Sequence, residues 1–323
     1  AAQAGKLTIS IYCTNIQYMS YAELHCLSSY SFLRGASHPH ELVERASHCG
    51  YRALAITDEC SLAGVVKAHV AASETGLHLI IGSELNLEEG IRLVALVPSR
   101  AAYSELSGLI SMARRRSPKG EYRVTLRDVI FHLKRCLLIW LPAENNPTLR
   151  AYGKQLQRLC KDRLWVGIAY LLGNNEINRY LAIQTLASEL GIPTLACGNV
   201  QMHCASRKPL HDVFTALRHN TSIARLGRRR LANSQQHLRN LNTLHKLYPQ
   251  ALLDETLRVA GLCHFTLNEL RYEYPEEVVP PGYDAKRYLR ELVATGTRER
   301  WPKGVPETIQ QRIETELTLI AEL

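Results

Sequence analysis

Polar residues that could hold a metal ion follow several short apolar stretches, at positions where strands are expected to end. His25, Asp58, Glu59, Glu84 and His203 each stand at or just after such a stretch. If the strands form an α/β barrel, their carboxyl ends meet at one mouth and these side chains converge there. Imidazole and carboxylate groups together are ligands for zinc or manganese. The same residues also suit a simpler role as polar groups hydrogen-bonded to loops, because no His-x-His pair anchors the cluster.

Other sequence patterns associated with catalysis are missing from the 323 residues: there is no Walker A sequence, no GxGxxG and no GxSxG. The nine cysteines are an odd number and include no CxxC pair, which argues against a disulfide framework and a structural zinc finger. A cytoplasmic location is the simplest expectation. With 46% hydrophobic and 21% charged residues, the composition is that of a globular protein, and no apolar stretch is long enough to cross a membrane.

Short apolar runs alternate with segments of helical periodicity over about the first 200 residues. The expected strands are residues 21–26, 53–57, 78–81, 92–97, 136–141, 164–170 and 194–197. Helices that connect such strands through short loops favour a mostly parallel sheet covered by helices. Seven strands in this length predict an α/β fold built as a closed or nearly closed barrel.

The remainder of the chain is expected to be helical. Helices are predicted at residues 209–217, 236–247, 250–262, 284–295 and 305–323, with a Pro- and Gly-rich linker at 272–283. The last helix reaches Leu323 without a stop signal, so we expect the sequence to be the front part of a larger protein. Residues 1–18 show no strong periodicity and are expected to form a disordered N-terminal extension.

The net charge of +9 is concentrated in two basic patches. Residues 114–123 carry a net charge of +4 and residues 207–230 a net charge of +6. Such patches suit a polyanion, because each neutralised phosphate releases counterions. They are equally common as solvated surface loops. The residues that we expect to contact nucleic acid are Arg114, Arg115, Arg116, Lys119, Arg228, Arg229 and Arg230.

Several longer motifs resemble the start of bacterial error-prone DNA polymerases, which are damage-inducible relatives of the replicative polymerase III alpha subunit in the C family. They are YAELHCLSSYSFLRGASHP at 21–39, LAITDECSLAGVVKAH at 54–69, IIGSEL at 80–85, ARRRSPKGEYR at 113–123, SRKPLHDVFTALR at 206–218, LRYEYPEEVVPPGYD at 270–284 and IETELTLIAEL at 313–323. The resemblance implies a polymerase and histidinol phosphatase (PHP) domain, a distorted seven-stranded barrel, followed by the entry to a polymerase palm.

The resemblance also implies a domain organisation and a function. The PHP barrel with its trailing helices would span residues 19–271, and the linker with the first palm helices would span 272–323. The whole protein would be a DNA-directed DNA polymerase for DNA replication, DNA repair and translesion synthesis after DNA damage. Primer–template DNA, deoxynucleoside triphosphates and magnesium would be required. A sliding clamp and accessory mutagenesis proteins would be partners. The polymerase aspartates would lie beyond Leu323, so no residue here is expected to be catalytic.

The metal-ligand pattern of the PHP family is incomplete in this sequence. His25, Asp58 and Glu84 match ligand positions, whereas the pattern is broken at Leu27, Glu59, Asn199 and Gln201. Three ligands are too few for a multinuclear site, so no metal is expected. We expect instead that these residues hydrogen-bond across the barrel mouth, with the amides of Asn199 and Gln201 as donors. The alternatives are a free-standing metal-dependent PHP phosphoesterase and a truncated product without activity.

Overall fold

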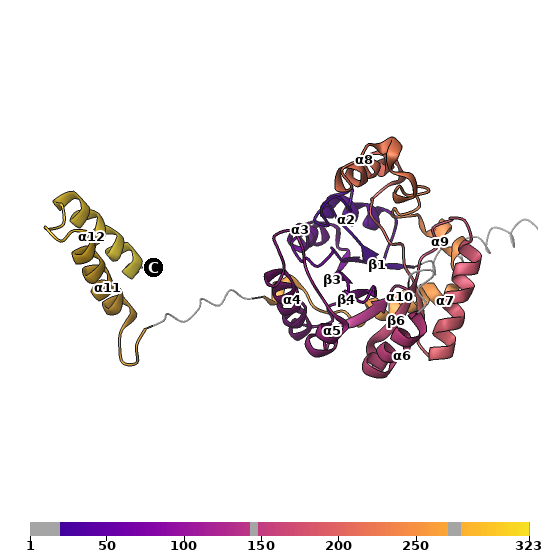
Figure 1. Cartoon of the computed structure of the whole chain (residues 1–323), viewed down its shortest axis with the longest axis horizontal. Coiled ribbons are helices and arrows are strands. Elements are labelled where there is room, and N and C mark those ends of the chain that lie inside the picture. The colour runs from indigo at the N-terminus through magenta and orange to yellow at the C-terminus, as the bar shows by residue number, and fades with distance from the viewer. Residues whose placement is uncertain (1–19, 143–147, 271–278, 323) are drawn as a thin grey trace, which may run out of the picture. The chain divides into compact units, whose positions relative to one another are not determined.

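The computed structural model describes residues 20–142, 148–270 and 279–322. These residues belong to two compact units, which divide between Leu270 and Arg271. The first contains all of the described strands, and the second contains two helices (Figure 1). The expected extension at 1–18 and much of the expected linker at 272–283 lie outside the described residues.

The first unit is built on one seven-stranded sheet whose strands follow their order in the chain. The strands are β1 (Ala22–Cys26), β2 (Ala53–Ile56), β3 (His78–Asn86), β4 (Arg92–Leu96), β5 (Leu137–Trp140), β6 (Leu164–Ile168) and β7 (Thr194–Ala196). A bridge between Cys26 and Val200 joins the end of β1 to the chain just after β7. The sheet therefore curls into a nearly closed barrel, which confirms the fold expected from the sequence.

Helices surround the strands, as Figure 1 shows for α2 to α7. The helices of the first unit are α2 (Pro39–His48), α3 (Val65–Thr75), α4 (Arg100–Arg115), α5 (Leu126–His132), α6 (Leu149–Cys160), α7 (Glu176–Leu190), α8 (Lys208–Arg218), α9 (Leu241–Leu247) and α10 (Gln250–Ala260). Helix α9 begins later than expected, because the Asn240 side chain accepts a hydrogen bond from the Thr243 amide and caps the helix there.

The sheet is mostly parallel, as expected, with β4 as the exception. Strand β4 runs antiparallel to both β3 and β5, whereas the other neighbouring pairs are parallel. The connection from β3 to β4 covers only residues 87–91 and turns at Gly90, whose φ is 76°. A parallel crossover needs about a dozen residues, so this short connection can only form a hairpin.

The core has two layers because successive strand residues face opposite sides of the sheet. Ala53 and Ala55 of β2 belong to one buried cluster, which α10 joins through Val259 and Ala260. The intervening Leu54 belongs to the other cluster, which also contains residues of the surrounding helices. Both faces of the sheet therefore carry buried apolar side chains, as expected for a barrel inside a ring of helices.

The second unit is a pair of helices, α11 (Ala285–Arg300) and α12 (Glu307–Glu322). Asp284 caps α11 by accepting a hydrogen bond from the Arg287 amide. An ion pair of 3.0 Å between Arg290 and Glu314 joins the two helices. Leu317 is the buried residue of this pair among the residues described.

Candidate functional site

A buried pair of an imidazole and a carboxylate lies at the mouth of the barrel. His25 stands near the end of β1 and Glu84 in β3, and 2.7 Å separates Nε2 from Oε2, with both side chains 0% exposed. Burial lowers the pKa of His25, although the hydrogen bond to Glu84 opposes this shift. The imidazole is therefore neutral and donates its Nε2–H to the Glu84 carboxylate.

The register between β1 and β2 explains how His25 reaches this position. Pairing between the two strands shifts between Glu23 and Cys26. A one-residue shift moves the side chains that follow to the opposite face of a sheet. Leu24 joins the apolar cluster shared by the seven strands, and His25 contacts Glu84. The irregularity therefore lets two consecutive residues of β1 face the barrel interior.

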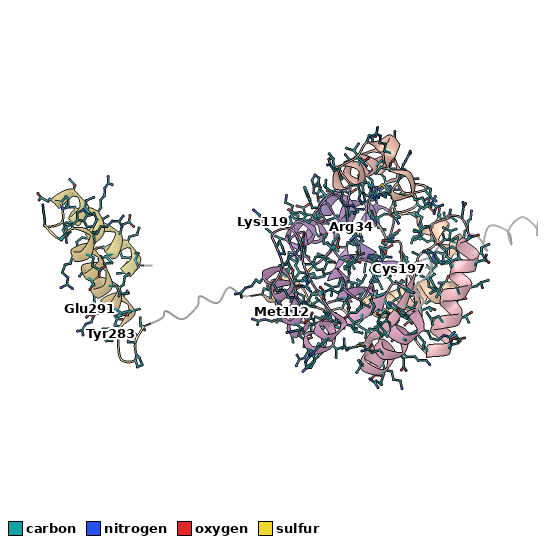
Figure 2. The ribbon with its side chains drawn as sticks, viewed as in Figure 1. Arg34, Met112, Lys119, Cys197, Tyr283 and Glu291 are labelled. Atoms are coloured by element: carbon teal, nitrogen blue, oxygen red, sulfur yellow. The ribbon has the colours of Figure 1, made fainter. Side chains whose placement is uncertain are left out.

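Arg34 forms ion pairs with two carboxylates of this mouth. Its Nη1 donates to Oε2 of Glu59 at 2.5 Å and to Oε1 of Glu84 at 2.7 Å. Burial alone would lower the pKa of Arg34, but the two carboxylates outweigh burial and raise it. Burial likewise opposes ionisation of Glu84, yet His25 and Arg34 hold the pKa of Glu84 well below its usual range. Figure 2 labels Arg34 within the first unit.

Two further side chains complete the environment of Glu59. The Tyr122 hydroxyl donates to Oε1 of Glu59 at 2.8 Å, and the Asn86 amide donates to the same oxygen at 2.7 Å. The Asn86 amide also reaches Oε1 of Glu84 at 3.2 Å. Burial opposes ionisation of Glu59, but Arg34 outweighs it, so the pKa of Glu59 is lowered. Both carboxylates are thus ionised and bonded to donors of the chain.

Asp58 is bound by a loop rather than by the other charged residues of the mouth. Ser28 donates its amide to Oδ1 at 2.8 Å and its hydroxyl to Oδ2 at 2.7 Å, and the Ser31 hydroxyl donates to Oδ1 at 2.7 Å. Burial nevertheless raises the pKa of Asp58 above its usual value. Gly64 allows the backbone to pass close to the Asp58 carboxylate, since a Cβ at this position would lie 2.6 Å from Oδ2 of Asp58.

Part of the barrel matches a known domain family. The PHP domain family matches residues 23–154. These residues include His25, Arg34, Asp58, Glu59 and Glu84. The family match thus runs from β1 to β5 and includes the side chains at the barrel mouth.

The sequence is also similar to error-prone DNA polymerases. It is 48% identical over 305 residues to the one from Saccharophagus degradans, covering 94% of this chain and 30% of the relative. It is 48% identical over 304 residues to the one from Methylococcus capsulatus, covering 94% of this chain and 29% of the relative. The chain therefore spans about 30% of the length of these curated relatives.

Solved structures show weaker similarity. A protein from Bifidobacterium adolescentis described as a metal-dependent phosphoesterase aligns with a TM-score of 0.43 and 17% identity, over 56% of this chain and 87% of that one. An amidohydrolase from Chromobacterium violaceum aligns with a TM-score of 0.45 and 13% identity, over 56% of this chain and 88% of that one.

The side chains at the mouth of the barrel do not fit a metal ion as they are arranged. The nearest atoms of His25 and Glu84 bond to each other, Glu59 and Glu84 bond to Arg34, and Asp58 bonds to serines. Nδ1 of His25 has no partner among the described residues, but a single nitrogen does not make a site. In the part of the chain that the structure describes, no three His, Cys, Asp or Glu side chains form a group that could hold a metal ion.

Of the two amides expected to close the mouth, Gln201 bonds elsewhere. Gln201 pairs with a histidine of α8, with 2.6 Å between its Oε1 and Nε2 of His211. Oδ1 of Asn199 has no hydrogen-bond partner among the described residues. Hydrogen bonds do hold the mouth together, but the donors to Asp58 and Glu84 are serines, Asn86, Arg34 and His25. His203 lies aside from this network, with its Nδ1 2.9 Å from Oγ of Ser37.

The first basic patch contains both structural and exposed residues. Arg114 donates to the carbonyls of Glu59 and Cys60 at 3.3 and 3.1 Å and lies over the Tyr122 ring. Arg116 forms an ion pair with Asp128. Arg115 and Lys119 are exposed, and Figure 2 labels Lys119 at the periphery of the unit. Two of the four predicted DNA contacts in this patch thus have roles within the fold.

The second basic patch, residues 207–230, comprises α8 and the segment that follows it. Arg230 lies 3.0 Å from Asp212, which also pairs with Lys208 at 2.8 Å. Arg228 and Arg229 are exposed and form no ion pair with another described residue. These two guanidinium groups are therefore available to an anionic partner, whereas Arg230 is partly neutralised.

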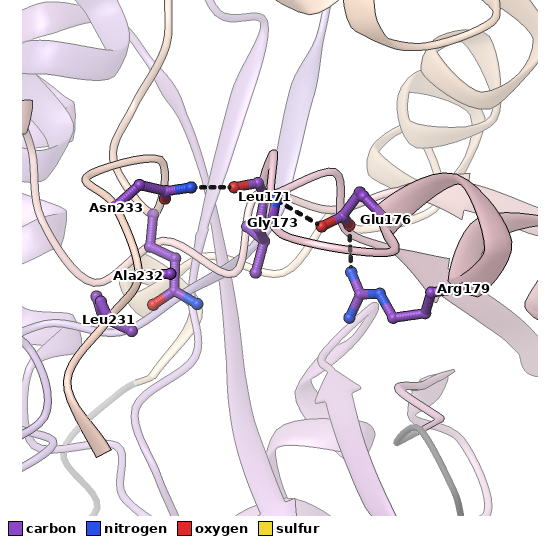
Figure 3. A pocket seen from close by; sticks show the side chains of 8 residues that line it. Leu171, Gly173, Glu176, Arg179, Leu231, Ala232 and Asn233 are labelled. Atoms are coloured by element: carbon purple, nitrogen blue, oxygen red, sulfur yellow. Dashed lines mark hydrogen bonds and ion pairs between the residues drawn. The ribbon is translucent and has the colours of Figure 1, made fainter. Parts of the chain in front are cut away.

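A cavity of about 370 Å³ opens beside the loop that follows β6 (Figure 3). Asn233 donates to the Leu171 carbonyl at 2.7 Å, and Glu176 accepts from the Gly173 amide at 3.1 Å. Glu176 also pairs with Arg179 at 2.7 Å. The charged groups of this cavity therefore bond to one another or to the backbone, and the residues predicted from the sequence do not line it.

Arg34 is the main residue that the sequence analysis missed. An arginine by itself does not indicate a buried ion pair, but the neighbouring residues in the sequence indicate a tightly packed loop. The segment 28–37 is rich in serine, and Gly35 follows the arginine directly. A Cβ at Gly35 would lie 1.9 Å from the Ser28 carbonyl oxygen, so only glycine permits this close packing.

Proposed function

We propose that this chain is the N-terminal part of an error-prone, DNA-templated DNA polymerase. The observation that carries the proposal is the 48% identity over 305 residues to proteins named error-prone DNA polymerase. Residues 19–271 would be the PHP domain with its trailing helices, and residues 272–323 the linker and first helices of the palm domain. The whole protein would add deoxynucleotides to a primer on a DNA template, with magnesium at carboxylates outside this chain.

In this proposal the PHP barrel acts as a scaffold. A hydrolytic site needs ligands that are free to bind a metal ion and a substrate. At this mouth the carboxylates of Asp58, Glu59 and Glu84 are bonded to serines, an arginine and an amide instead. Packed as it is, the mouth can stabilise the barrel and present loops to the rest of the polymerase.

The biological setting is proposed from the name that the relatives carry. An error-prone polymerase would serve DNA replication past damaged bases, translesion synthesis and DNA repair in the cytoplasm. Accessory mutagenesis proteins and a sliding clamp would bring it to primer ends. None of the described helices has the length and apolar character needed to cross a membrane.

The alternative is a metal-dependent PHP phosphoesterase that uses His25, Asp58 and Glu84 as ligands. The arrangement of the mouth favours the polymerase scaffold, because Glu84 already pairs with both His25 and Arg34. Hydrolysis would require these bonds to break before a metal ion could bind.

Primer extension by the product of the complete reading frame tests the proposal. The purified protein is expected to extend a primer on undamaged template and past an abasic site in the presence of magnesium. The 323-residue chain is expected to leave p-nitrophenyl phosphate intact with manganese. Absence of extension, together with hydrolysis that is lost in His25→Ala, would establish the phosphoesterase instead.

A further inference from the structure

One nitrogen atom bridges two carboxylates at the mouth of the PHP barrel. Nη1 of Arg34 lies 2.5 Å from Oε2 of Glu59 and 2.7 Å from Oε1 of Glu84. The two acids come from different parts of the sheet, one just after β2 and the other from β3, and an isolated bridge pairs them. A cation held between carboxylates of neighbouring strands is the arrangement that a divalent metal ion adopts in oxygen-rich sites.

We propose that the guanidinium of Arg34 takes the place of a divalent cation at this mouth and thereby excludes one. The Arg34 side chain is 15% exposed and Glu84 is 0% exposed, so the contact is largely shielded from water. A buried carboxylate needs a compensating positive charge, and a guanidinium supplies it without a metal. The mouth is thus neutralised by the chain itself.

The loop that carries Arg34 holds it firmly in this position. The amides of Arg34 and Gly35 donate to the Ser31 carbonyl at 2.8 and 3.1 Å, and the Ala36 amide donates to the Gln201 carbonyl at 2.7 Å. The Ser31 hydroxyl meanwhile binds Asp58. Since the loop is fixed at several points, its backbone does not have to be ordered when the guanidinium binds the carboxylates.

The proposal predicts a latent cation site. Without Arg34, the carboxylates of Glu59 and Glu84 face each other with no positive charge between them, and a divalent cation would relieve their repulsion. The inference depends on the geometry of the barrel and not on the polymerase activity proposed for the whole protein. It can therefore fail or succeed independently of that activity.

Manganese binding to the 323-residue chain tests this inference. Bound Mn²⁺ is measured by electron paramagnetic resonance, and Tm by calorimetry with and without Mn²⁺. The wild-type chain and Arg34→Lys are expected to bind no Mn²⁺ at the mouth, with Tm unchanged by the ion. Arg34→Ala is expected to bind about one equivalent of Mn²⁺, and its lowered Tm should rise with Mn²⁺.

Two variants control for unspecific effects. Arg116→Ala removes a different ion-paired arginine, and Mn²⁺ should not change its Tm. Adding Glu84→Gln to Arg34→Ala should abolish the gained binding. If Arg34→Ala does not fold, its refolding yield is measured with and without Mn²⁺, and recovery with the ion supports the proposal. Wild-type binding that is lost in Glu84→Gln, or an Arg34→Ala chain that does not respond to Mn²⁺, would overturn it.

Discussion

Among single residues, Glu84 is the one whose ionised state depends most directly on the charges around it. The side chain is fully buried between β1 and the loop that carries Arg34, where an ionised carboxylate would be unstable without partners. The bonds from His25 and Arg34 outweigh the cost of burial and lower the pKa of Glu84. A carboxyl group whose pKa is lower in the folded than in the unfolded state stabilises the fold at pH values above its unfolded-state pKa. This stabilisation is lost as the pH falls toward the folded-state pKa.

The variant Glu84→Gln tests this balance. At pH 7 we expect the free energy of unfolding to fall by about 3 kcal/mol, because Arg34 keeps its charge but loses one buried partner. The difference from wild type should shrink by more than about 1 kcal/mol between pH 5 and pH 3, below the ordinary glutamate pKa of about 4.3. Urea unfolding at several pH values measures both effects.

An exposed glutamate serves as the matched control for that measurement. Glu88 pairs with Arg123 at the surface, so Glu88→Gln should cost less than about 1 kcal/mol. A Glu84→Gln effect as small as that of the control, or one that is independent of pH, would show that the buried network contributes little to stability.

At the scale of elements, the loop between β1 and α2 depends on one glycine. A Cβ at Gly35 would come within 1.9 Å of the Ser28 carbonyl, which the backbone cannot accommodate without moving. We expect Gly35→Ala to destabilise the fold by about 3 kcal/mol or more. Gly108→Ala, within α4 where a Cβ meets no atom within 4 Å, should instead stabilise by about 0.5–1 kcal/mol. Thermal unfolding of both variants measures the contrast, and equal Tm values would contradict it.

The segment after α8 carries the prediction about DNA. Arg228 and Arg229 are exposed, whereas Arg230 is close to Asp212. We expect weak, sequence-independent binding of duplex or primer–template DNA that declines with added salt. Replacing Arg228 and Arg229 together with alanine should reduce the slope of log K against log salt by up to about 1.8, since each phosphate contact contributes about 0.9.

Fluorescence anisotropy titrations at increasing KCl measure this slope. The control is Arg116→Ala, because Arg116 is already paired with Asp128 and should contribute less to phosphate binding. If the double variant keeps the wild-type slope, this segment is a solvated loop and another surface binds DNA.

At the scale of the whole molecule, the described hydrophobic clusters of the barrel draw their residues from the first unit. The buried members of both clusters lie between Tyr21 and Phe265. We therefore expect a chain of residues 19–271 to unfold cooperatively, with a Tm within about 3 °C of the 323-residue chain. Calorimetry of both chains measures this. A much lower Tm for the shorter chain would show that the α11–α12 unit stabilises the barrel.

Local sequence patterns predicted the barrel well because strand and helix periodicities are properties of neighbouring residues. The seven strands appear where apolar runs were expected, and the PHP resemblance agrees with the family match at residues 23–154. The apolar runs do not indicate the antiparallel direction of β4, because alternation of side chains is the same in parallel and antiparallel strands. The short connection at 87–91 decides that direction.

The candidate site shows the same division between sequence and tertiary structure. The sequence by itself placed His25 and Asp58 at strand ends, because strand ends can be read from composition and turn residues. Glu84 was expected just after a strand at 78–81, but it lies within β3, which continues to Asn86. Only the tertiary structure brought Arg34 between Glu59 and Glu84, 25 and 50 positions away along the chain. Electrostatic interactions depend on distance and burial rather than on sequence separation, so the charge that neutralises the barrel mouth is decided by folding.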